Sequence, residues 1–343
     1  KFDARDSHGC YKVNSNGSVS EVFTDTSINN GEVCLSYVTS GKTYKVVEST
    51  VPTGYTKMPD AQITATNKNN AATNISEKGL TDKPTIFRFI KTTNDTDNIS
   101  KKYSSEIIKK IDSLTFNIHK VDSNQALIFL NKGTTGLCSD KSCNEYHYTT
   151  KEGIKDLHTN NGQLVVKYLP KGKYVIKEAS SMPGYYYDEG VTFEVTDSSN
   201  SSIAGYKDAT AKIINKYTKI QFEKNDIYKY YQNPEESKVG SVIFDTAEFV
   251  LRDENGIIVK LTKESDGNYT YLLNGNNSEE KIKTKNGALS ITHLLSNKKY
   301  YIEEVKAPTG FILPTNVAAP KDKPSKWVWE GHPYVVYNVG ATK

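Results

Sequence analysis

Three residue types recur in this chain where they could form a covalent cross-link. Two residues of each type stand out: Lys120, Lys224, Glu178, Glu304, Asn215 and Asn338. Burial disfavours the charged form of an ionisable group, so an inward lysine is expected to be a neutral amine and an inward glutamate a carboxylic acid. The amine is then a nucleophile, and the acid can polarise an amide carbonyl and shuttle protons. Attack on the asparagine amide would expel ammonia and leave a Lys–Asn isopeptide bond, once per molecule.

Alternating apolar residues predict the β-strands that would position these side chains. Two runs lead to a lysine and two lead to an asparagine: 114–123 with Lys120, 218–226 with Lys224, 211–217 with Asn215 and 334–340 with Asn338. In each run the polar residue continues the apolar face, which is costly unless a partner satisfies it. The alternative is that the lysines and glutamates are ordinary solvent-facing residues, the commoner fate of both types.

A phrase that occurs three times sets the domain organisation. It reads YKVVESTVPTGY at 44–55, YVIKEASSMPGY at 174–185 and YYIEEVKAPTGF at 300–311. Each copy has a tyrosine, a glutamate four residues later, and a turn of proline, glycine and an aromatic residue. A period of about 130 residues predicts an array of repeated domains, each the size of a β-sandwich.

The chain resembles a known family in these residues. It is similar to tandem Cna protein B-type domains, also called SpaA-like or prealbumin-like domains. The similarity lies in the opening apolar-x-Lys-x-Asp runs, the Tyr-x-x-x-Glu phrase with its Pro-x-Gly turn, and the closing asparagines. These domains belong to Gram-positive surface adhesins and pilins. The resemblance implies an all-β fold of three Ig-like β-sandwiches. It also implies isopeptide bonds Lys120–Asn215 and Lys224–Asn338, promoted by Glu178 and Glu304.

We expect the three domains to span 1–94, 113–216 and 217–343, with a linker at 95–112 that contains one short element. We expect the first domain to lack its first strand and to have its last strand at 85–95. Glu48 has no visible lysine partner, although this last strand offers Lys91 or Asn94. We therefore predict no isopeptide bond in the first domain.

Four cysteines could form two disulfides: Cys10, Cys34, Cys138 and Cys143. A Cys10–Cys34 disulfide would replace the missing cross-link of the first domain. Two disulfides would place the protein in an oxidising compartment, whereas four free thiols are the alternative. No histidine lies at ligand spacing from either cysteine pair, so we expect no zinc and no other metal.

Composition narrows the class of function. Lysine and arginine number 44 against 40 acidic residues, a balance that argues against nucleic-acid binding. No apolar stretch is long enough to span a membrane, and no cofactor motif or catalytic constellation of an enzyme is apparent. We expect an extracellular, cell-wall-anchored adhesin stalk or pilin segment whose anchor lies outside this sequence. Its partners would be other domains of the same surface protein.

The alternative function is a module that binds a host protein or glycan. Trp327 and Trp329 lie two residues apart and could form a platform for stacking on a sugar. A tryptophan pair at this spacing on a strand more often serves packing. An exposed aromatic patch around Trp327 in the folded protein would favour the binding function.

Overall fold

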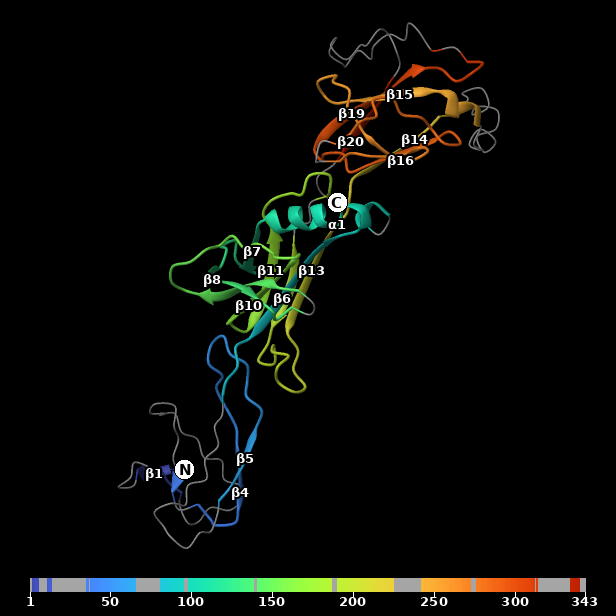
Figure 1. Ribbon diagram of the computed structural model, residues 1–343. Coiled ribbons are helices and arrows are strands. Elements are labelled where there is room, and N and C mark those ends of the chain that lie inside the picture. The colour runs from blue at the N-terminus through green and yellow to red at the C-terminus, as the bar shows by residue number, and fades with distance from the viewer. Residues whose placement is uncertain are drawn as a thin grey trace. The chain divides into compact units, whose positions relative to one another are not determined.

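The computed structural model describes residues 2–5, 11–13, 35–36, 38–65, 81–95, 98–138, 141–186, 190–224, 242–272, 276–311, 313 and 334–339. Within these ranges the chain is built almost wholly of β-strands, with one α-helix and one short 3-10 helix (Figure 1). The predicted all-β class is therefore confirmed. The chain divides into two compact units, Lys1–Pro84 and Thr85–Lys343.

In its described residues, the N-terminal unit contains two small sheets. One has the strand order β1-β2-β3, and the other is an antiparallel pair of β4 and β5. Their bounds are Phe2–Arg5 for β1, Tyr11–Val13 for β2, Leu35–Ser36 for β3, Thr43–Val46 for β4 and Ala61–Thr64 for β5. The first copy of the repeated phrase begins in β4 and ends in a turn before β5.

The second unit begins with a β-sandwich that we call the middle domain, residues 85–217. A five-stranded sheet, in the order β13-β6-β10-β9-β8, faces a three-stranded sheet in the order β12-β11-β7 (Figure 1). The bounds are Ile86–Thr93 for β6, Phe116–Lys120 for β7, Ile128–Thr135 for β8, Cys143–Thr149 for β9, Gln163–Lys167 for β10, Gly172–Glu178 for β11, Val191–Val195 for β12 and Ala209–Asn215 for β13. Fully buried Phe87, Phe89 and Phe116 pack between the sheets.

Strand β6 corrects the expected boundary of the first domain. We expected 85–95 to close that domain, yet β6 pairs antiparallel with β10 and parallel with β13. The physical reason is its alternation: Phe87 and Phe89 face the core of the middle domain and need both of its sheets for burial. The middle domain therefore begins near Thr85, and β6 is its first strand.

The segment expected as a linker, 95–112, forms most of helix α1, Asn98–Ser113. Ile107 and Ile111 are four residues apart and therefore share one helix face. Ile111 is buried in the core of the middle domain, and Ile107 packs against that core. This apolar face, which continues to buried Leu114, holds the helix against the sandwich.

The second unit continues with another sandwich, the C-terminal domain, from residue 218 onward. Its two sheets have the orders β14-β18-β17-β16 and β15-β19-β20, and its hydrophobic core is separate from that of the middle domain. The bounds are Lys219–Glu223 for β14, Val242–Thr246 for the 3-10 helix η1, Glu248–Arg252 for β15, Thr262–Ser265 for β16, Asn268–Thr270 for β17, Ala288–Thr292 for β18, Lys298–Lys306 for β19 and Tyr334–Val339 for β20.

The repeated phrase has the same turn in all three copies. The backbone N–H of the final aromatic residue donates to a carbonyl three residues earlier: Tyr55 to Pro52, Tyr185 to Met182 and Phe311 to Pro308. The glycine before each aromatic residue has a positive φ, between 82° and 87°. Glycine adopts this conformation without the Cβ clash of other residues, which explains its place in every copy.

The middle and C-terminal domains meet in a cluster around Asp95. This carboxylate accepts hydrogen bonds from His293 Nε2 at 2.9 Å and from Tyr185 and Thr93 hydroxyls at 2.7 Å each. The His293 ring also stacks on Tyr217. Burial alone would raise the pKa of Asp95, but the hydrogen bonds from His293, Tyr185 and Thr93 outweigh burial and lower the pKa below its ordinary value.

We expect Asp95 to make the melting temperature depend on acid. Its folded-state pKa is lowered, so its contribution to stability is complete above the unfolded-state pKa of about 3.9 and is lost as the pH falls below that value. Melting curves of the wild type and Asp95→Asn should differ at neutral pH and converge in acid. A constant difference across the acidic range would contradict this role for Asp95.

Candidate functional site

The middle domain places a lysine, a glutamate and an asparagine together in its core. Lys91 lies near the end of β6 and Asn215 at the end of β13, and the parallel register of these strands pairs Lys91 with Ile213. Asn215 is two residues further along, so both side chains lie on the inner face of the same sheet. Glu178, the last residue of β11, approaches from the opposite sheet. Residues far apart in sequence thus converge between the two sheets.

The three side chains are almost fully buried and close to one another. Lys91 is 2% exposed, Glu178 0% and Asn215 1%. The Lys91 Nζ lies 4.0 Å from Glu178 Oε2 and donates to the carbonyl of Thr92 at 3.0 Å. Asn215 Nδ2 donates to both carboxylate oxygens of Glu178, at 3.0 and 3.1 Å. The carboxylate therefore contacts the amine on one side and the amide on the other.

The remaining atom of the amide is unsatisfied. Asn215 Oδ1 is buried and has no hydrogen-bond partner. A half turn of the amide plane exchanges its oxygen and nitrogen, and it would direct Oδ1 at Glu178. A carboxylic acid at Glu178 could then donate to Oδ1, which withdraws electrons from the amide carbon. This geometry suits acid-promoted attack of an amine on an amide.

The structure places Lys120, the lysine expected at this site, elsewhere. Lys120 is exposed and pairs with Tyr174, whereas Glu178 pairs with Phe116 at the other end of the same two strands. Four strand residues span about 13 Å. Lys120 does continue the apolar alternation of β7, but β7 ends there and the core ends with it. Asn215 and Glu178 therefore meet as expected, but their lysine is Lys91.

The signal for Lys91 is present in the sequence. The run TIFRFIK at 85–91 matches TKIQFEK at 218–224 in its threonine, its alternate apolar residues and its lysine. The threonines have the same contacts: Thr85 Oγ1 donates to the carbonyl of Leu169 at 2.6 Å, and Thr218 Oγ1 to that of Leu294 at 2.5 Å. Lys91 is thus the counterpart of Lys224.

The C-terminal domain brings two of its three expected residues together. Lys224 Nζ lies 3.0 Å from Glu304 Oε2, with 23% of the lysine side chain exposed. Glu304 Oε1 is buried and has no hydrogen-bond partner. Asn338 lies in β20, whose register pairs it with Lys299, five residues from Glu304 along β19. This register does not bring Asn338 to the Lys224–Glu304 pair.

Glu48, the glutamate of the first copy, has a different role. It is half-buried, and its Oε2 accepts a hydrogen bond from the backbone N–H of Met58 at 3.0 Å. This contact joins the two sides of the turn that follows β4. Lys91 and Asn94, the partners that we considered for Glu48, both belong to the unit that begins at Thr85.

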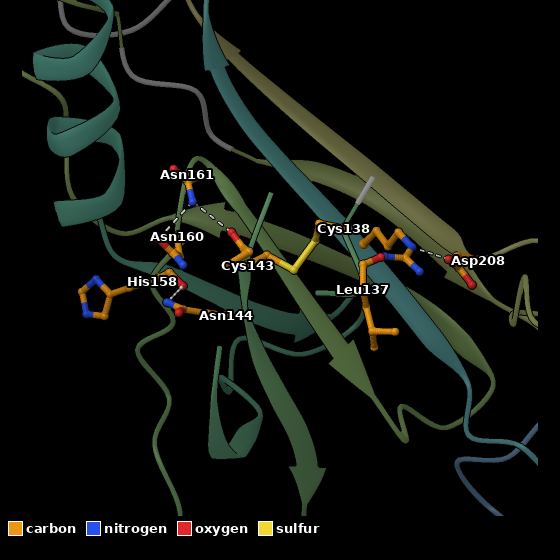
Figure 2. Close-up of a disulfide and its surroundings, with 10 residues drawn as sticks. Leu137, Cys138, Cys143, Asn144, His158, Asn160, Asn161 and Asp208 are labelled. Atoms are coloured by element: carbon orange, nitrogen blue, oxygen red, sulfur yellow. Dashed lines mark hydrogen bonds and ion pairs between the residues drawn. A yellow bond between two sulfur atoms is a disulfide. The ribbon is translucent and has the colours of Figure 1, made fainter. Parts of the chain in front are cut away.

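One of the expected cysteine pairs is a disulfide. Cys138 and Cys143 are bonded, with their Cα atoms 6.1 Å apart (Figure 2). Both sulfur-bearing residues are buried with Ile86 and Val165 in a small apolar cluster separate from the main core. Cys10 and Cys34 lie outside the described residues, as do Trp327 and Trp329.

The disulfide loop is also bound to the sheet by Arg88. Its guanidinium donates to the carboxylate of Asp208, which lies just before β13, and to the carbonyl of Leu137 beside the disulfide. Asn144, next to Cys143, donates to the carbonyl of His158 at 2.8 Å. The Arg88 contacts tie β6, which holds Lys91, to the segment just before β13, which holds Asn215.

Within the described ranges, no group of three or more acidic, histidine or cysteine side chains could hold a metal ion. Nor does any helix in that part of the chain have the length and apolar character needed to cross a membrane.

The fold and site together define a β-sandwich domain with a buried lysine, carboxyl and amide. Residues 99–210 match the family model of the SpaA prealbumin-like fold domain. This segment is therefore similar to domains of that family, and the resemblance seen in the sequence is confirmed for residues 99–210. The matched segment includes Glu178, while Lys91 and Asn215 flank it.

Several solved structures are similar to parts of the chain. A streptococcal ancillary pilin is 18% identical, with 87% of this chain and 71% of that chain covered and a TM-score of 0.29. The minor pilin of Streptococcus agalactiae is 14% identical, with 50% and 63% covered and a TM-score of 0.27. The shaft pilin SpaA of Lactobacillus rhamnosus GG is 14% identical, with 75% and 94% covered and a TM-score of 0.25. None of the curated proteins compared with the chain matches it.

Replacement of Lys91 by methionine should destabilise the protein far more than replacement of Lys120. Lys91→Met leaves the buried carboxyl group of Glu178 without its lysine partner, a change that costs about 3 kcal/mol or more. Lys120 is exposed, so Lys120→Met should change the free energy of unfolding by no more than about 0.5 kcal/mol. Denaturant unfolding of the two variants measures the difference. Equal effects would contradict the buried position of Lys91.

Proposed function

We propose that this chain is a structural segment of a Gram-positive cell-surface protein, an adhesin stalk or pilin, in which Lys91 and Asn215 form an isopeptide bond. The observation that supports the proposal is the convergence of three nearly unexposed polar residues, Lys91, Glu178 and Asn215, between the two sheets of the middle domain. The match to the SpaA prealbumin-like fold domain family supports the same class of protein.

The proposed reaction needs only these three side chains. A proton first moves from the Lys91 ammonium to Glu178, because a neutral pair costs less than two charges in an apolar core. The amine then attacks Cγ of Asn215 while Glu178 donates its proton to the amide. The attacking nitrogen gives up one of its two protons to Glu178, the C–N bond to the old amide nitrogen breaks and ammonia leaves. An amide bond then joins Lys91 Nζ to Cγ of Asn215, and Glu178 is again protonated. Atoms balance with ammonia as the only other product, and the fold supplies the proximity.

The position of the bond suits a chain that is pulled at its ends. Lys91 lies in the first strand of the middle domain and Asn215 in the last, and these strands are parallel neighbours. A force transmitted along the chain would pass through the new bond, and residues 92–214 would be bypassed. The bond would also close a long loop, which limits the freedom of the unfolded chain as a disulfide does.

For the C-terminal domain we propose the Lys224–Glu304 pair as the corresponding amine and acid. The close ion pair and the unpartnered Glu304 Oε1 support a polar site in which one carboxyl oxygen is left to contact an amide. Asn338 remains our predicted partner for Lys224. That bond would require Asn338 to approach Glu304 from its present register opposite Lys299.

The intact mass of the reduced, purified protein tests the proposal. We expect the loss of one ammonia for each isopeptide bond, and a cross-linked peptide that joins Lys91 to Asn215. Lys91→Ala and Glu178→Ala should each abolish that cross-link, because they remove the nucleophile or the acid. The matched control Lys120→Ala should retain it, since Lys120 is exposed at the far end of β7. A wild-type mass without any ammonia deficit would refute the proposed bonds.

A further inference from the structure

A second carboxylate in the middle domain binds the turn that contacts Lys91. Asp112, near the end of helix α1, accepts three hydrogen bonds from one turn. The Thr159 hydroxyl donates at 2.7 Å, the backbone N–H of Asn161 at 2.9 Å and that of Gly162 at 2.8 Å. Asp112 thereby fixes the backbone of the Asn161–Gly162 turn that precedes β10.

The same turn holds the backbone of Lys91. The Lys91 N–H donates to the carbonyl of Gly162 at 2.8 Å, beyond the last ladder pair of β6 and β10, Ile90 with Gln163. Asn161 and Gly162 have positive φ values of 54° and 73°. A Cβ added to Gly162 would lie 2.7 Å from the Lys91 carbonyl oxygen, so the approach requires glycine. The turn and Lys91 are therefore in close backbone contact.

The C-terminal domain repeats this arrangement with different local structure. Asp245 lies in the 3-10 helix η1, not in a long α-helix, yet it also accepts from a threonine hydroxyl and two backbone N–H groups. The donors are Thr284 at 3.1 Å, Asn286 at 3.0 Å and Gly287 at 3.1 Å. The Lys224 N–H in turn donates to the Gly287 carbonyl at 2.7 Å.

The spacing agrees as well as the contacts. Asp112 follows Lys91 and Asp245 follows Lys224 by the same distance, although one segment contains helix α1 and the other helix η1. The apolar face of helix α1 is formed by Ile107 and Ile111, so the packing of the helix does not require Asp112. The shared feature of the two domains is the link from aspartate through an Asn-Gly turn to the backbone of the reactive lysine.

We propose that Asp112 and Asp245 are positioning residues for isopeptide formation. The inference rests on the proposed function. Each aspartate fixes its turn, the turn fixes the lysine backbone, and the lysine Nζ is thereby held where it can reach the amide. A displacement of about 1 Å in a reacting group can slow a reaction about a hundredfold. Neither aspartate touches the reacting atoms, so each acts only through the lysine backbone.

The test follows the rate of cross-linking in newly made full-length chains. Protein synthesis in a cell-free system is stopped, and mass spectrometry follows the peptide that joins Lys91 to Asn215 over time. We expect Asp112→Asn to slow the appearance of this peptide by about tenfold or more, because a small displacement of the reacting lysine amine slows the reaction. The amide of asparagine has one acceptor oxygen where the carboxylate has two. Asp245→Asn is the matched control and should leave this rate unchanged.

Two further variants separate positioning from general stability. Thr159→Val removes one of the three hydrogen-bond donors to Asp112, so it should slow cross-linking, though less than Asp112→Asn does. This variant keeps the test informative if Asp112→Asn folds poorly. In the Glu178→Ala background, which cannot cross-link, the melting temperature reports the structural role of Asp112 alone.

The outcomes distinguish the two proposals. Slow cross-linking of folded Asp112→Asn, with a normal rate for Asp245→Asn, would support the positioning role. A lower melting temperature with an unchanged cross-linking rate in Asp112→Asn and Thr159→Val would overturn it. Absence of any cross-link in the wild type would refute the proposed function itself.

Discussion

The burial of Glu178 between two sheets is the constraint on which the middle domain depends. A carboxyl group without solvent requires partners, and an unpaired one would cost more than a sandwich of this size can offset. Lys91 and Asn215 are those partners, and each must come from a particular strand at a particular register. A shift of β6 or β13 by one residue would move its polar residue to the outer face. The contacts of the buried residues therefore help to fix the register of β6 and β13, and that register in turn brings the residues together.

Several features of the fold keep that register. The parallel pairing of β6 with β13 aligns Lys91 and Asn215, and the Asn161–Gly162 turn fixes β6 from its other side. On the outer face, Arg88 bonds to Asp208, and the disulfide cluster covers β6 and β10. Contacts on both faces of one strand leave it little freedom to slide. Lys91 is held by its backbone, since its own flexible side chain could not provide such precision.

The fold class and two of the three buried residues could be predicted because they lie in the repeated phrase or in an uninterrupted alternation. Glu178 precedes a Pro-Gly turn that recurs in all three copies, and Asn215 ends a strand that alternates throughout. The sequence places Lys91 with the preceding domain because helix α1 separates its strand from the rest of the middle domain. The alternating pattern of β7 then predicts Lys120, in place of Lys91, as the buried lysine. Alternation indicates a face but not where the core ends, and only the pairing of Lys120 with Tyr174 shows that it lies outside.

The two lysine–glutamate pairs differ in a way that bears on their chemistry. In the middle domain the amine and the carboxylate are 4.0 Å apart with both side chains 0% exposed, and the amide completes the contacts of the carboxylate. In the C-terminal domain the pair is at 3.0 Å and the lysine side chain is 23% exposed. Water that reaches an amine stabilises its ammonium form and competes for the hydrogen bonds that an amide would make. If the proposed bond forms in this domain, the last strand would have to supply the asparagine and would also exclude water from the lysine. Covering the lysine and supplying the amide would then be one event, and the proposed reaction would await the closure of that domain.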